Sequence, residues 1–424
     1  MKRLIHMFCL IIVFVLGSFG CGQSQSDEGA DQHLPAETSL EQDLKPEPEP
    51  EAVPEQAPPE DPVVQQMKTL SVAEKIGQLV IIGIEGSQMD DTARRLLETY
   101  HVGGFIFFKD NIQNPSQAVR LFNEIKEANA QQPIPLWMSI DEEGGRVTRL
   151  PDELSKLPAS GKIGKENNSD LAAAVGKQIG KRLAAFGLNL VYAPVLDVNS
   201  NPGNPVIGDR AFSDQAEVVT QLGIAQMKGI QESGVVPVIK HFPGHGDTSV
   251  DSHTGLPIVN HGLERLNQLE LLPFREAVTE GANVVMVSHL LITEVDSSTP
   301  ASFSKPVITG LLREKLGFRG VVITDDMTMG AITGGEYDIG EAAVQSILAG
   351  SNIVMVGHDY VLEETVIQSL TNAVQEGRIS EEVLNDRVQT VLSLKHKHNV
   401  SDNKVEIPDI ESLNNETLQI LNNK

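Results

Sequence analysis

Short apolar, β-branched runs alternate with longer amphipathic stretches from residue 62 to about residue 400. Eight apolar runs have the length and composition of buried strands, at residues 79–84, 104–108, 136–140, 190–196, 236–241, 283–289, 321–324 and 352–356. Helical spacing fills the intervals, for example at residues 116–130, 169–186, 215–232, 263–280 and 341–349. Eight strand–helix repeats predict a parallel α/β fold, specifically a closed (β/α)8 barrel of the TIM type.

The motifs beside these runs help to choose between a barrel and an open sheet. No glycine-rich nucleotide-binding fingerprint or phosphate-binding loop follows the first run, which disfavours a doubly wound sheet. A helical hairpin that ends near His398 is expected to close the barrel, so residues 62–400 are interpreted as a single catalytic domain. Residues 401–424 are polar, and we expect this C-terminal tail to lie over the surface or to fray.

The N-terminus has the pattern of a targeting signal. Lys2 and Arg3 precede an apolar run over residues 7–16, which is shorter than the roughly 20 residues that span a membrane. Gly20-Cys21 resembles a bacterial lipoprotein cleavage site, so residues 1–20 are interpreted as a signal peptide and Cys21 as a lipidation site. This predicts a secreted protein that a lipid anchors to the outer face of the bacterial cell membrane. The alternative is a plain secretory signal with an incidental cysteine.

Residues 21–61 have the composition of a linker. Residues 27–61 contain twelve acidic residues against Lys45 alone, and seven prolines lie between residues 22 and 61. Large apolar side chains are almost absent there, so burial cannot offset the entropy lost on ordering. We therefore predict an acidic, disordered spacer between the lipid anchor and the barrel.

Charge and cysteine content exclude several classes of function. The net charge of −25 argues against a nucleic-acid-binding protein, which needs a basic surface. Both cysteines, Cys9 and Cys21, lie within the first 21 residues. The barrel therefore has no disulfide framework, no cysteine zinc site and no cysteine nucleophile.

Polar residues gather where the predicted strands end, which in a (β/α)8 barrel is the rim that holds active sites. One hypothesis is a metal site, for which the available ligands are His241, His245, Asp247, Asp251 and His253. Lys240 and Arg210 place fixed positive charge in the same region, which disfavours a bound cation. We therefore expect neither a metal ion nor a cofactor.

The second hypothesis is the hydrolysis of a glycosidic bond, which needs a proton donor and a carboxylate. Asp325, at the end of the seventh predicted strand, can supply the carboxylate, with Asp326 as the alternative. Asp251 can orient His253, and a histidine can donate a proton near neutral pH. The other interpretation of Asp251 and His253 is a hydrogen-bonded pair that only holds its loop.

Several motifs together resemble the bacterial β-N-acetylglucosaminidases, or β-N-acetylhexosaminidases, of glycoside hydrolase family 3. The resemblance covers about residues 65–395, with the motifs in the family's order. The motifs are Asp141-x-Glu143-Gly144-Gly145-Arg146-Val147-x-Arg149, Gly208-Asp209-Arg210, Lys240-His241-Phe242-Pro243-Gly244-His245-Gly246, Asp251-x-His253, Gly317-Phe318-x-Gly320 and Thr324-Asp325-Asp326-Met327.

This resemblance implies a retaining, exo-acting hydrolase. Asp325 would form a glycosyl-enzyme, and His253, held by Asp251, would act as acid and then as base. The residues that would bind the hydroxyls of a terminal N-acetylglucosamine (GlcNAc) are Asp141, Arg149, Arg210, Lys240 and His241. The alternatives are a GlcNAc phosphorylase of the same family and a catalytically inactive sugar-binding lipoprotein.

Scarce aromatic residues narrow the expected substrate. Trp137 is the only tryptophan, whereas enzymes that grip long polysaccharides commonly use several stacking platforms. We therefore predict a short pocket that releases one terminal sugar from GlcNAc-containing oligosaccharides. For a protein tethered at the cell surface, the expected substrates are peptidoglycan fragments such as muropeptides.

Some polar residues have a structural interpretation beside the functional one. Arg210 could pair with Asp209 or Asp197, and His289 could be a sugar contact or a hydrogen-bonded core histidine. His245 and Asp247 are expected to shape their loop. Glu142 and Glu143 are neighbours on an extended segment, so their side chains should point in opposite directions, and neither is expected to be catalytic.

Overall fold

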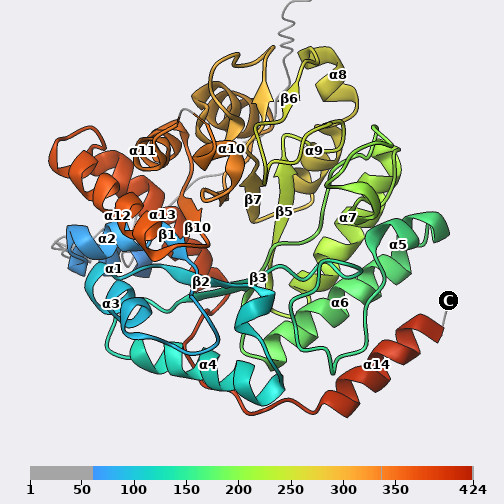
Figure 1. Ribbon diagram of the computed structural model, residues 1–424, viewed down its shortest axis with the longest axis horizontal. Helices are drawn as coiled ribbons and strands as arrows, with labels where there is room; N and C mark the ends of the chain where they lie inside the picture. Colours follow the sequence, from blue (N-terminus) through green and yellow to red (C-terminus); the bar gives the residue numbers. More distant parts are fainter. Residues whose placement is uncertain (1–60, 336, 423–424) are drawn as a thin grey trace, which may run out of the picture. The chain divides into compact units, whose positions relative to one another are not determined.

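The structure is a computed structural model that describes residues 61–335 and 337–422 (Figure 1). The predicted signal peptide, Cys21 and nearly all of the predicted acidic linker lie outside these residues. The strands are β1 (Val80–Ile82), β2 (Gly104–Phe107), β3 (Trp137–Ile140), β4 (Leu190–Val191), β5 (Val236–Phe242), β6 (Ile258–Val259), β7 (Val284–Val287), β8 (Leu291–Ile292), β9 (Val321–Asp326) and β10 (Ile353–Val356).

The α-helices are α1 (Pro62–Thr69), α2 (Val72–Gly77), α3 (Asp91–Tyr100), α4 (Pro115–Ala128), α5 (Ser160–Glu166), α6 (Ser169–Ala185), α7 (Ala216–Gln231), α8 (Leu263–Gln268), α9 (Leu272–Thr279), α10 (Gly330–Thr333), α11 (Ile339–Ala349), α12 (Tyr360–Gln375), α13 (Glu381–Lys397) and α14 (Ile410–Asn422). A π-helix, η4, spans Pro306–Lys315, and short 3₁₀ turns η1 (Lys109–Asn111), η2 (Gly208–Arg210) and η3 (Ala301–Phe303) complete the set.

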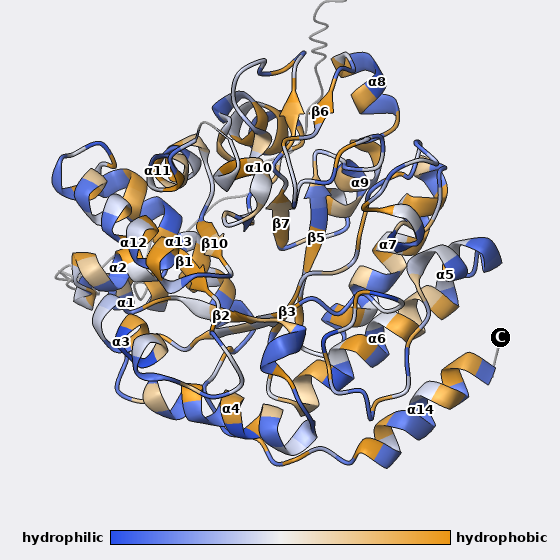
Figure 2. Cartoon of the chain, in the orientation of Figure 1, coloured by the Kyte–Doolittle hydropathy of each residue, from blue (hydrophilic) through white to orange (hydrophobic). Residues whose placement is uncertain are grey.

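Eight parallel strands close into a barrel in the order β1-β10-β9-β7-β5-β4-β3-β2. All eight coincide with the runs that the sequence predicted, although β5 is one residue longer and β9 two residues longer, so the (β/α)8 prediction is confirmed. These strands are buried along their whole lengths apart from Asp325, because side chains fill the inside of the barrel and helices cover the outside. Figure 2 shows the corresponding pattern, with apolar strands surrounded by helices that are polar on the outside. Among the strands of residues 61–335 and 337–422, β6 and β8 lie outside the barrel, as a two-stranded sheet.

Local capping explains where several outer helices begin. The Asn114 side chain accepts a hydrogen bond from the Gln117 amide at 3.0 Å, and a proline occupies the first position of α4. The Asp90 side chain caps α3 in the same way through the Ala93 amide at 2.8 Å. These caps satisfy amides that have no partner inside the helix, so the helices begin at these residues.

Two details differ from the predicted elements. The stretch at residues 263–280 forms two helices, α8 and α9, with a break around Leu269. The C-terminal tail forms α14, which contacts α6 through a hydrogen bond from the Gln178 side chain to the Leu413 carbonyl at 2.9 Å. Thr417 of α14 is fully buried against α6. The mostly polar composition of residues 401–424 gave no indication of this contact. None of the helices in the described residues is long and apolar enough to cross a membrane.

Candidate active site

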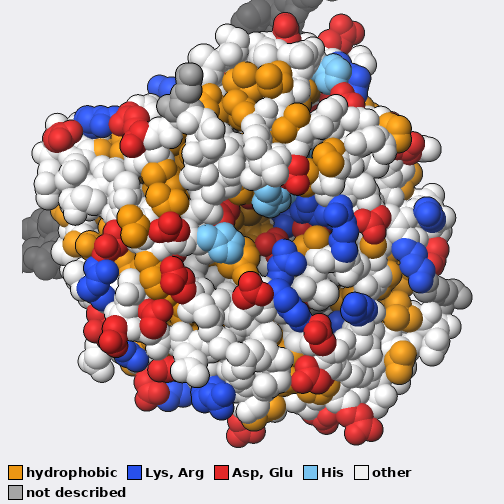
Figure 3. All heavy atoms as spheres, in the orientation of Figure 1, with side chains coloured by type: hydrophobic (Ala, Val, Ile, Leu, Met, Phe, Trp, Pro, Cys, Tyr) orange, Lys and Arg blue, Asp and Glu red, His pale blue; other side chains and the backbone are white. Residues whose placement is uncertain are grey.

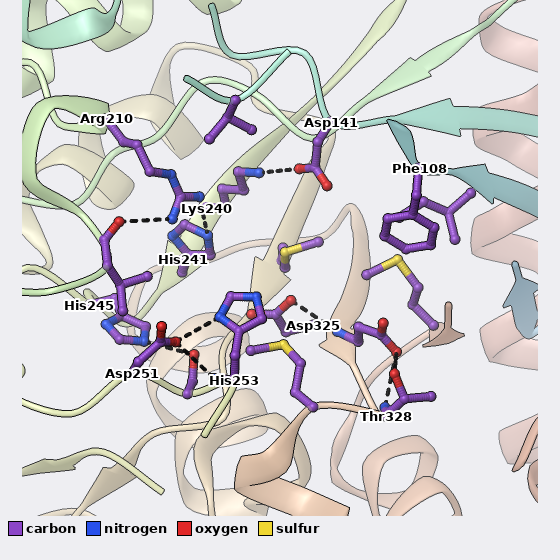
Figure 4. A pocket seen from close by; sticks show the side chains of 18 of the residues that line it. Phe108, Asp141, Arg210, Lys240, His241, His245, Asp251, His253, Asp325 and Thr328 are labelled. Carbon is purple, nitrogen blue, oxygen red and sulfur yellow. Dashed lines mark hydrogen bonds and ion pairs between the residues drawn. The ribbon is translucent and has the colours of Figure 1, made fainter. Parts of the chain in front are cut away.

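A cavity of about 490 Å³ opens at the carboxyl ends of the barrel strands. Figure 3 shows this hollow near the centre of the view, with Lys and Arg side chains along one edge and histidines beside it. All eight side chains predicted for catalysis and sugar binding line it: Asp141, Arg149, Arg210, Lys240, His241, Asp251, His253 and Asp325. The fold therefore brings the predicted set together in one cavity (Figure 4).

Asp325 and Asp326 follow one another on β9, yet both line the cavity. Neighbours on a regular strand point to opposite faces. Here Ile323 pairs with Ile353 of β10 and Asp326 with Met355, so three steps on β9 match two steps on β10. Such a bulge redirects side chains beside active sites. The irregular pairing allows two consecutive carboxyl groups to share one cavity.

The two carboxyl groups are held differently. Asp326 Oδ1 accepts hydrogen bonds from the Thr328 amide at 3.0 Å, the Thr328 hydroxyl at 2.9 Å and the Gly357 amide at 2.9 Å. Within the described residues, the Asp325 carboxylate accepts one hydrogen bond, from the Asp326 amide at 2.9 Å. Asp325 therefore keeps an oxygen available for a substrate, whereas Asp326 is largely committed to the protein.

Their pKa values also move apart. Burial would raise the pKa of Asp325, but attraction to His241 and His289 and the hydrogen bond from Asp326 bring it below its usual value. Burial raises the pKa of Asp326, and the hydrogen bonds that it accepts offset only part of this effect. Neighbouring carboxyl groups with opposite pKa shifts are typical of sites in which one stays ionised, and here that group is Asp325.

Glu143 joins two of the predicted sugar-binding cations. Its carboxylate accepts two hydrogen bonds from Arg210, at 2.9 and 2.8 Å, and lies 2.7 Å from Lys240 Nζ. Lys240 Nζ also lies 2.5 Å from an oxygen of Asp141. Burial would raise the pKa of Glu143, but the two cations hold it far below its usual value. Sequence reasoning missed this supporting role, because it asked only whether Glu143 was catalytic and concluded that it was not.

Glu142 has different hydrogen-bond partners from Glu143 and supports the turn that carries Arg149. Its carboxylate accepts hydrogen bonds from the Thr148 hydroxyl at 2.6 Å and from the Arg149 amide at 2.9 Å. The Arg149 guanidinium lines the cavity and has no ion pair or hydrogen bond in the part of the chain that the structure describes. Arg149 is thus a free donor on a fixed backbone.

His241 is fixed by Asp197, a fully buried residue on the segment that follows β4. His241 Nδ1 lies 2.6 Å from Asp197 Oδ2, and the Arg210 guanidinium lies 3.2 Å from His241 Nε2. A proton on Nδ1 fits both contacts, because Nε2 then accepts from the arginine. The structural alternative for Arg210, a pairing with Asp209 or Asp197, is not observed, because Arg210 pairs with Glu143.

Asp251 and His253 form the hydrogen-bonded pair that the motif suggested. Asp251 Oδ1 accepts from the His253 backbone amide at 2.9 Å and lies 2.7 Å from His253 Nδ1. Burial would raise the pKa of Asp251, but these hydrogen bonds lower it. The ionised carboxylate thus keeps a proton on Nδ1 and leaves Nε2 free to exchange one. Figure 4 shows the imidazole directed from Asp251 into the cavity.

The loop that carries this pair is docked against the segment that follows β9. The Gly330 amide donates to the His253 carbonyl at 3.2 Å, and the Ala331 amide donates to the Ser252 carbonyl at 3.0 Å. A Cβ atom on Gly330 would lie 2.5 Å from the His253 carbonyl oxygen, so this approach requires glycine. The dyad and Asp325 are thereby linked through the backbone.

His245 and His289 have structural contacts on both ring nitrogens. His245 contacts the Ser252 hydroxyl at 3.1 Å and the Thr248 hydroxyl at 2.8 Å, which confirms its predicted role in shaping the loop. Its burial lowers its pKa to about 4. His289 is fully buried between the Ser302 hydroxyl at 2.7 Å and the Asp326 carbonyl at 2.9 Å, which favours the core-histidine interpretation.

One group of possible metal ligands occurs among the residues that the structure describes: Asp247, His261 and Glu270. Arg265 lies 3.0 Å from the Glu270 carboxylate and 3.6 Å from that of Asp247. The guanidinium therefore already supplies positive charge to this group. His261 also contacts Asp247, which agrees with the predicted role of Asp247 in shaping the loop.

Comparison with known proteins identifies the family. The pattern described as the glycosyl hydrolase family 3 N terminal domain matches residues 71–394. The chain belongs to glycosyl hydrolase family 3. Beta-hexosaminidase A of Pseudoalteromonas piscicida is 36% identical over 326 residues, which cover 71% of this chain and 54% of that protein. This chain therefore spans about half the length of that relative.

Other similar proteins share more of their length with this chain. The beta-hexosaminidase of Tolumonas auensis is 35% identical over 297 residues, which cover 69% of this chain and 86% of that protein. A family 3 beta-N-acetylglucosaminidase from Paenibacillus sp. has 41% identity and a TM-score of 0.78, covering 83% of this chain and 68% of that structure. These similarities agree with the glycoside hydrolase class that the motifs predicted.

Proposed function

We propose that this chain is a retaining exo-β-N-acetylglucosaminidase. The observation that carries the proposal is the convergence of Asp325, the Asp251–His253 pair and a hydroxyl-binding set in one cavity. Sugar binding alone does not need an ionised carboxylate opposite an oriented proton donor. The resemblance to proteins named beta-hexosaminidase supports the same activity.

The mechanism follows from the atoms available in the cavity. Asp325 attacks the anomeric carbon while His253 Nε2 gives its proton to the glycosidic oxygen, and the leaving sugar departs as an alcohol. His253 then takes a proton from a water molecule, whose oxygen displaces Asp325 and restores the free enzyme. Asp251 stabilises the imidazolium that exists before the first step and after the second.

The sugar-binding groups suit a single terminal GlcNAc. Asp141 offers a carboxylate to hydroxyl donors, while Arg149, Arg210 and Lys240 offer charged donors to hydroxyl oxygens. Trp137 is fully buried and does not line the cavity, so it provides no platform for a long polysaccharide. A short pocket of this kind favours the release of one sugar at a time.

The natural substrates that we propose are peptidoglycan fragments at the outer face of the bacterial cell membrane. The signal-like N-terminus supports this location, with Cys21 as the lipid-bearing residue. Mass spectrometry of the mature protein from its own membranes would test the anchor directly. A mature chain that begins at another residue, or a Cys21 without lipid, would contradict it.

Product analysis on GlcNAc–MurNAc, with and without phosphate, tests the reaction. Hydrolysis predicts free GlcNAc under both conditions, with retained anomeric configuration at early times by nuclear magnetic resonance. Formation of GlcNAc 1-phosphate would instead establish a phosphorylase. Binding without turnover would establish a sugar-binding protein.

A further inference from the structure

One wall of the cavity differs from the charged wall that binds hydroxyls. Phe108 stands on the side opposite Arg210 and His245 (Figure 4). It follows β2 directly, two residues after Ile106, so both side chains face the barrel interior. Within the described chain, Phe108 is the only Phe, Tyr or Trp side chain that lines this cavity.

The Phe108 ring is held by a stacked partner and a glycine. Its centroid lies 4.0 Å from that of the His358 ring, with 29° between the planes. A Cβ atom on Gly357 would lie 2.7 Å from the phenyl ring and 2.7 Å from the Asp326 carboxylate, so the ring packs where only glycine fits. His358 Nε2 lies 3.9 Å from the same carboxylate. The pair is therefore positioned before any ligand binds.

Exposure separates the floor of the cavity from its mouth. The Lys240 and Arg210 side chains are 3% and 12% exposed, whereas those of His253 and His358 are 64% and 59% exposed. The terminal sugar therefore occupies the buried, charged end. The leaving sugar must lie at the exposed end, because His253 protonates the oxygen that joins the two sugars.

We propose that Phe108 and His358 form the binding surface for the leaving sugar. This inference rests on the proposed glycosidase function and adds a determinant of specificity to it. The apolar face of a pyranose packs well on an aromatic ring, and the ring pair offers such a surface beside the reacting bond. The determinant selects substrates whose leaving group is a sugar, rather than a small group that leaves unaided.

The test compares two substrates that share the terminal sugar but differ in the leaving group. β-GlcNAc fluoride has no leaving sugar, whereas GlcNAc–MurNAc has one. For Phe108→Leu, the ratio of kcat/KM for the disaccharide to that for the fluoride should fall about five- to tenfold, as expected for the loss of one aromatic contact. His358→Ala should lower this ratio about threefold. Phe108→Tyr keeps an aromatic ring at this position and should therefore keep the wild-type ratio.

His396→Ala is the matched control, because His396 is an exposed histidine on α13 that does not line the cavity. This variant should leave the ratio unchanged. If Phe108→Leu lowered kcat/KM for both substrates by the same factor, the inference would fail while the proposed function stood. If the wild-type protein hydrolysed neither substrate, both would fail. A crystal structure of the Asp325→Ala variant with GlcNAc–MurNAc should show the MurNAc ring against Phe108, and a MurNAc ring elsewhere would overturn the inference.

Discussion

Lys240 and Lys395 are buried to nearly the same extent, 2% and 3% exposed, at opposite ends of one barrel. Lys240 lies at the carboxyl end, 2.5 Å from Asp141 and 2.7 Å from Glu143. Lys395 lies at the other end, where its Nζ donates to the Gly103 and Pro135 carbonyls at 2.9 and 2.7 Å, just before β2 and β3 begin. One amine faces carboxylates and the other faces neutral oxygens.

The partners of the two lysines indicate different roles, with Lys240 in the proposed active site and Lys395 in a contact that stabilises the fold. Carboxylates balance the charge of Lys240, which lines the cavity where we propose that the sugar binds. The Lys395 amine has neutral acceptors, including the Gln78 side chain at 2.8 Å, so burial lowers its pKa to about 7. Lys395 Nζ also lies 5.6 Å from the centroid of the Trp137 ring. The single tryptophan therefore packs at the amino end of the barrel strands, away from the cavity.

The largest expected effect is at the carboxyl end. Asp325→Ala should lower kcat about 10⁴-fold or more, because it removes the proposed nucleophile. The thermal midpoint should change little, since within the described residues the Asp325 carboxylate accepts a single hydrogen bond. Steady-state kinetics and circular dichroism measure the two quantities. Restored turnover of Asp325→Gly with azide would identify the nucleophile, and an active Asp325→Ala variant would exclude this residue from that role.

Glu143→Gln tests whether the charged network positions the sugar-binding cations. The change removes the negative charge that pairs with both Arg210 and Lys240. The two cations should then be held less firmly, so we expect kcat/KM to fall about a hundredfold. Breaking a buried ion pair should also lower the free energy of unfolding by about 3 kcal/mol, measured by urea denaturation. Glu280→Gln, which removes an exposed pair with Lys228, is the control and should change stability by less than about 0.5 kcal/mol. Equal effects of the two variants would refute the network.

Gly330→Ala tests the docking of the acid–base loop. The added Cβ atom would displace the His253 carbonyl and with it the imidazole, so kcat/KM for GlcNAc–MurNAc should fall about tenfold. A dinitrophenyl glycoside needs little proton donation and should be affected less. Gly310→Ala is the control, because its Cβ atom would have no neighbour within 4 Å. Equal losses on both substrates would show that the loop does not act through proton transfer.

The smallest effect on activity is expected at the closed end. Lys395→Met should keep kcat within about twofold but lower stability by about 1–3 kcal/mol near pH 7, since it leaves buried carbonyls without a donor. The Lys395 pKa is lower in the folded than in the unfolded chain, so the wild type gains stability as pH rises from about 7 toward 10. The difference in thermal midpoint between wild type and Lys395→Met should therefore increase as pH rises across this range. The exposed Lys404→Met control should show no such increase, and a constant difference for Lys395→Met would contradict the titration.

Much of the fold follows from local pattern. Apolar runs of strand length, separated by amphipathic stretches, predicted all eight barrel strands, because a strand buried on both faces is mostly apolar. The break between α8 and α9 and the packing of α14 were not predicted. The break has a local signal, Pro273 in the first turn of α9, whereas the packing of α14 depends on distant contacts such as the burial of Thr417 against α6.

The chain's motifs by themselves determined the family, the barrel and which polar residues would meet, because the carboxyl ends of parallel strands share one rim. Only the tertiary structure decided how those residues are held. Strand alternation would place just one of Asp325 and Asp326 in the cavity, whereas the irregular β9–β10 pairing places both there. The partnership of Glu143 with Arg210 and the stacking of Phe108 on His358 join segments 67 and 250 residues apart. Contacts at such separations are set by packing, which local sequence does not encode.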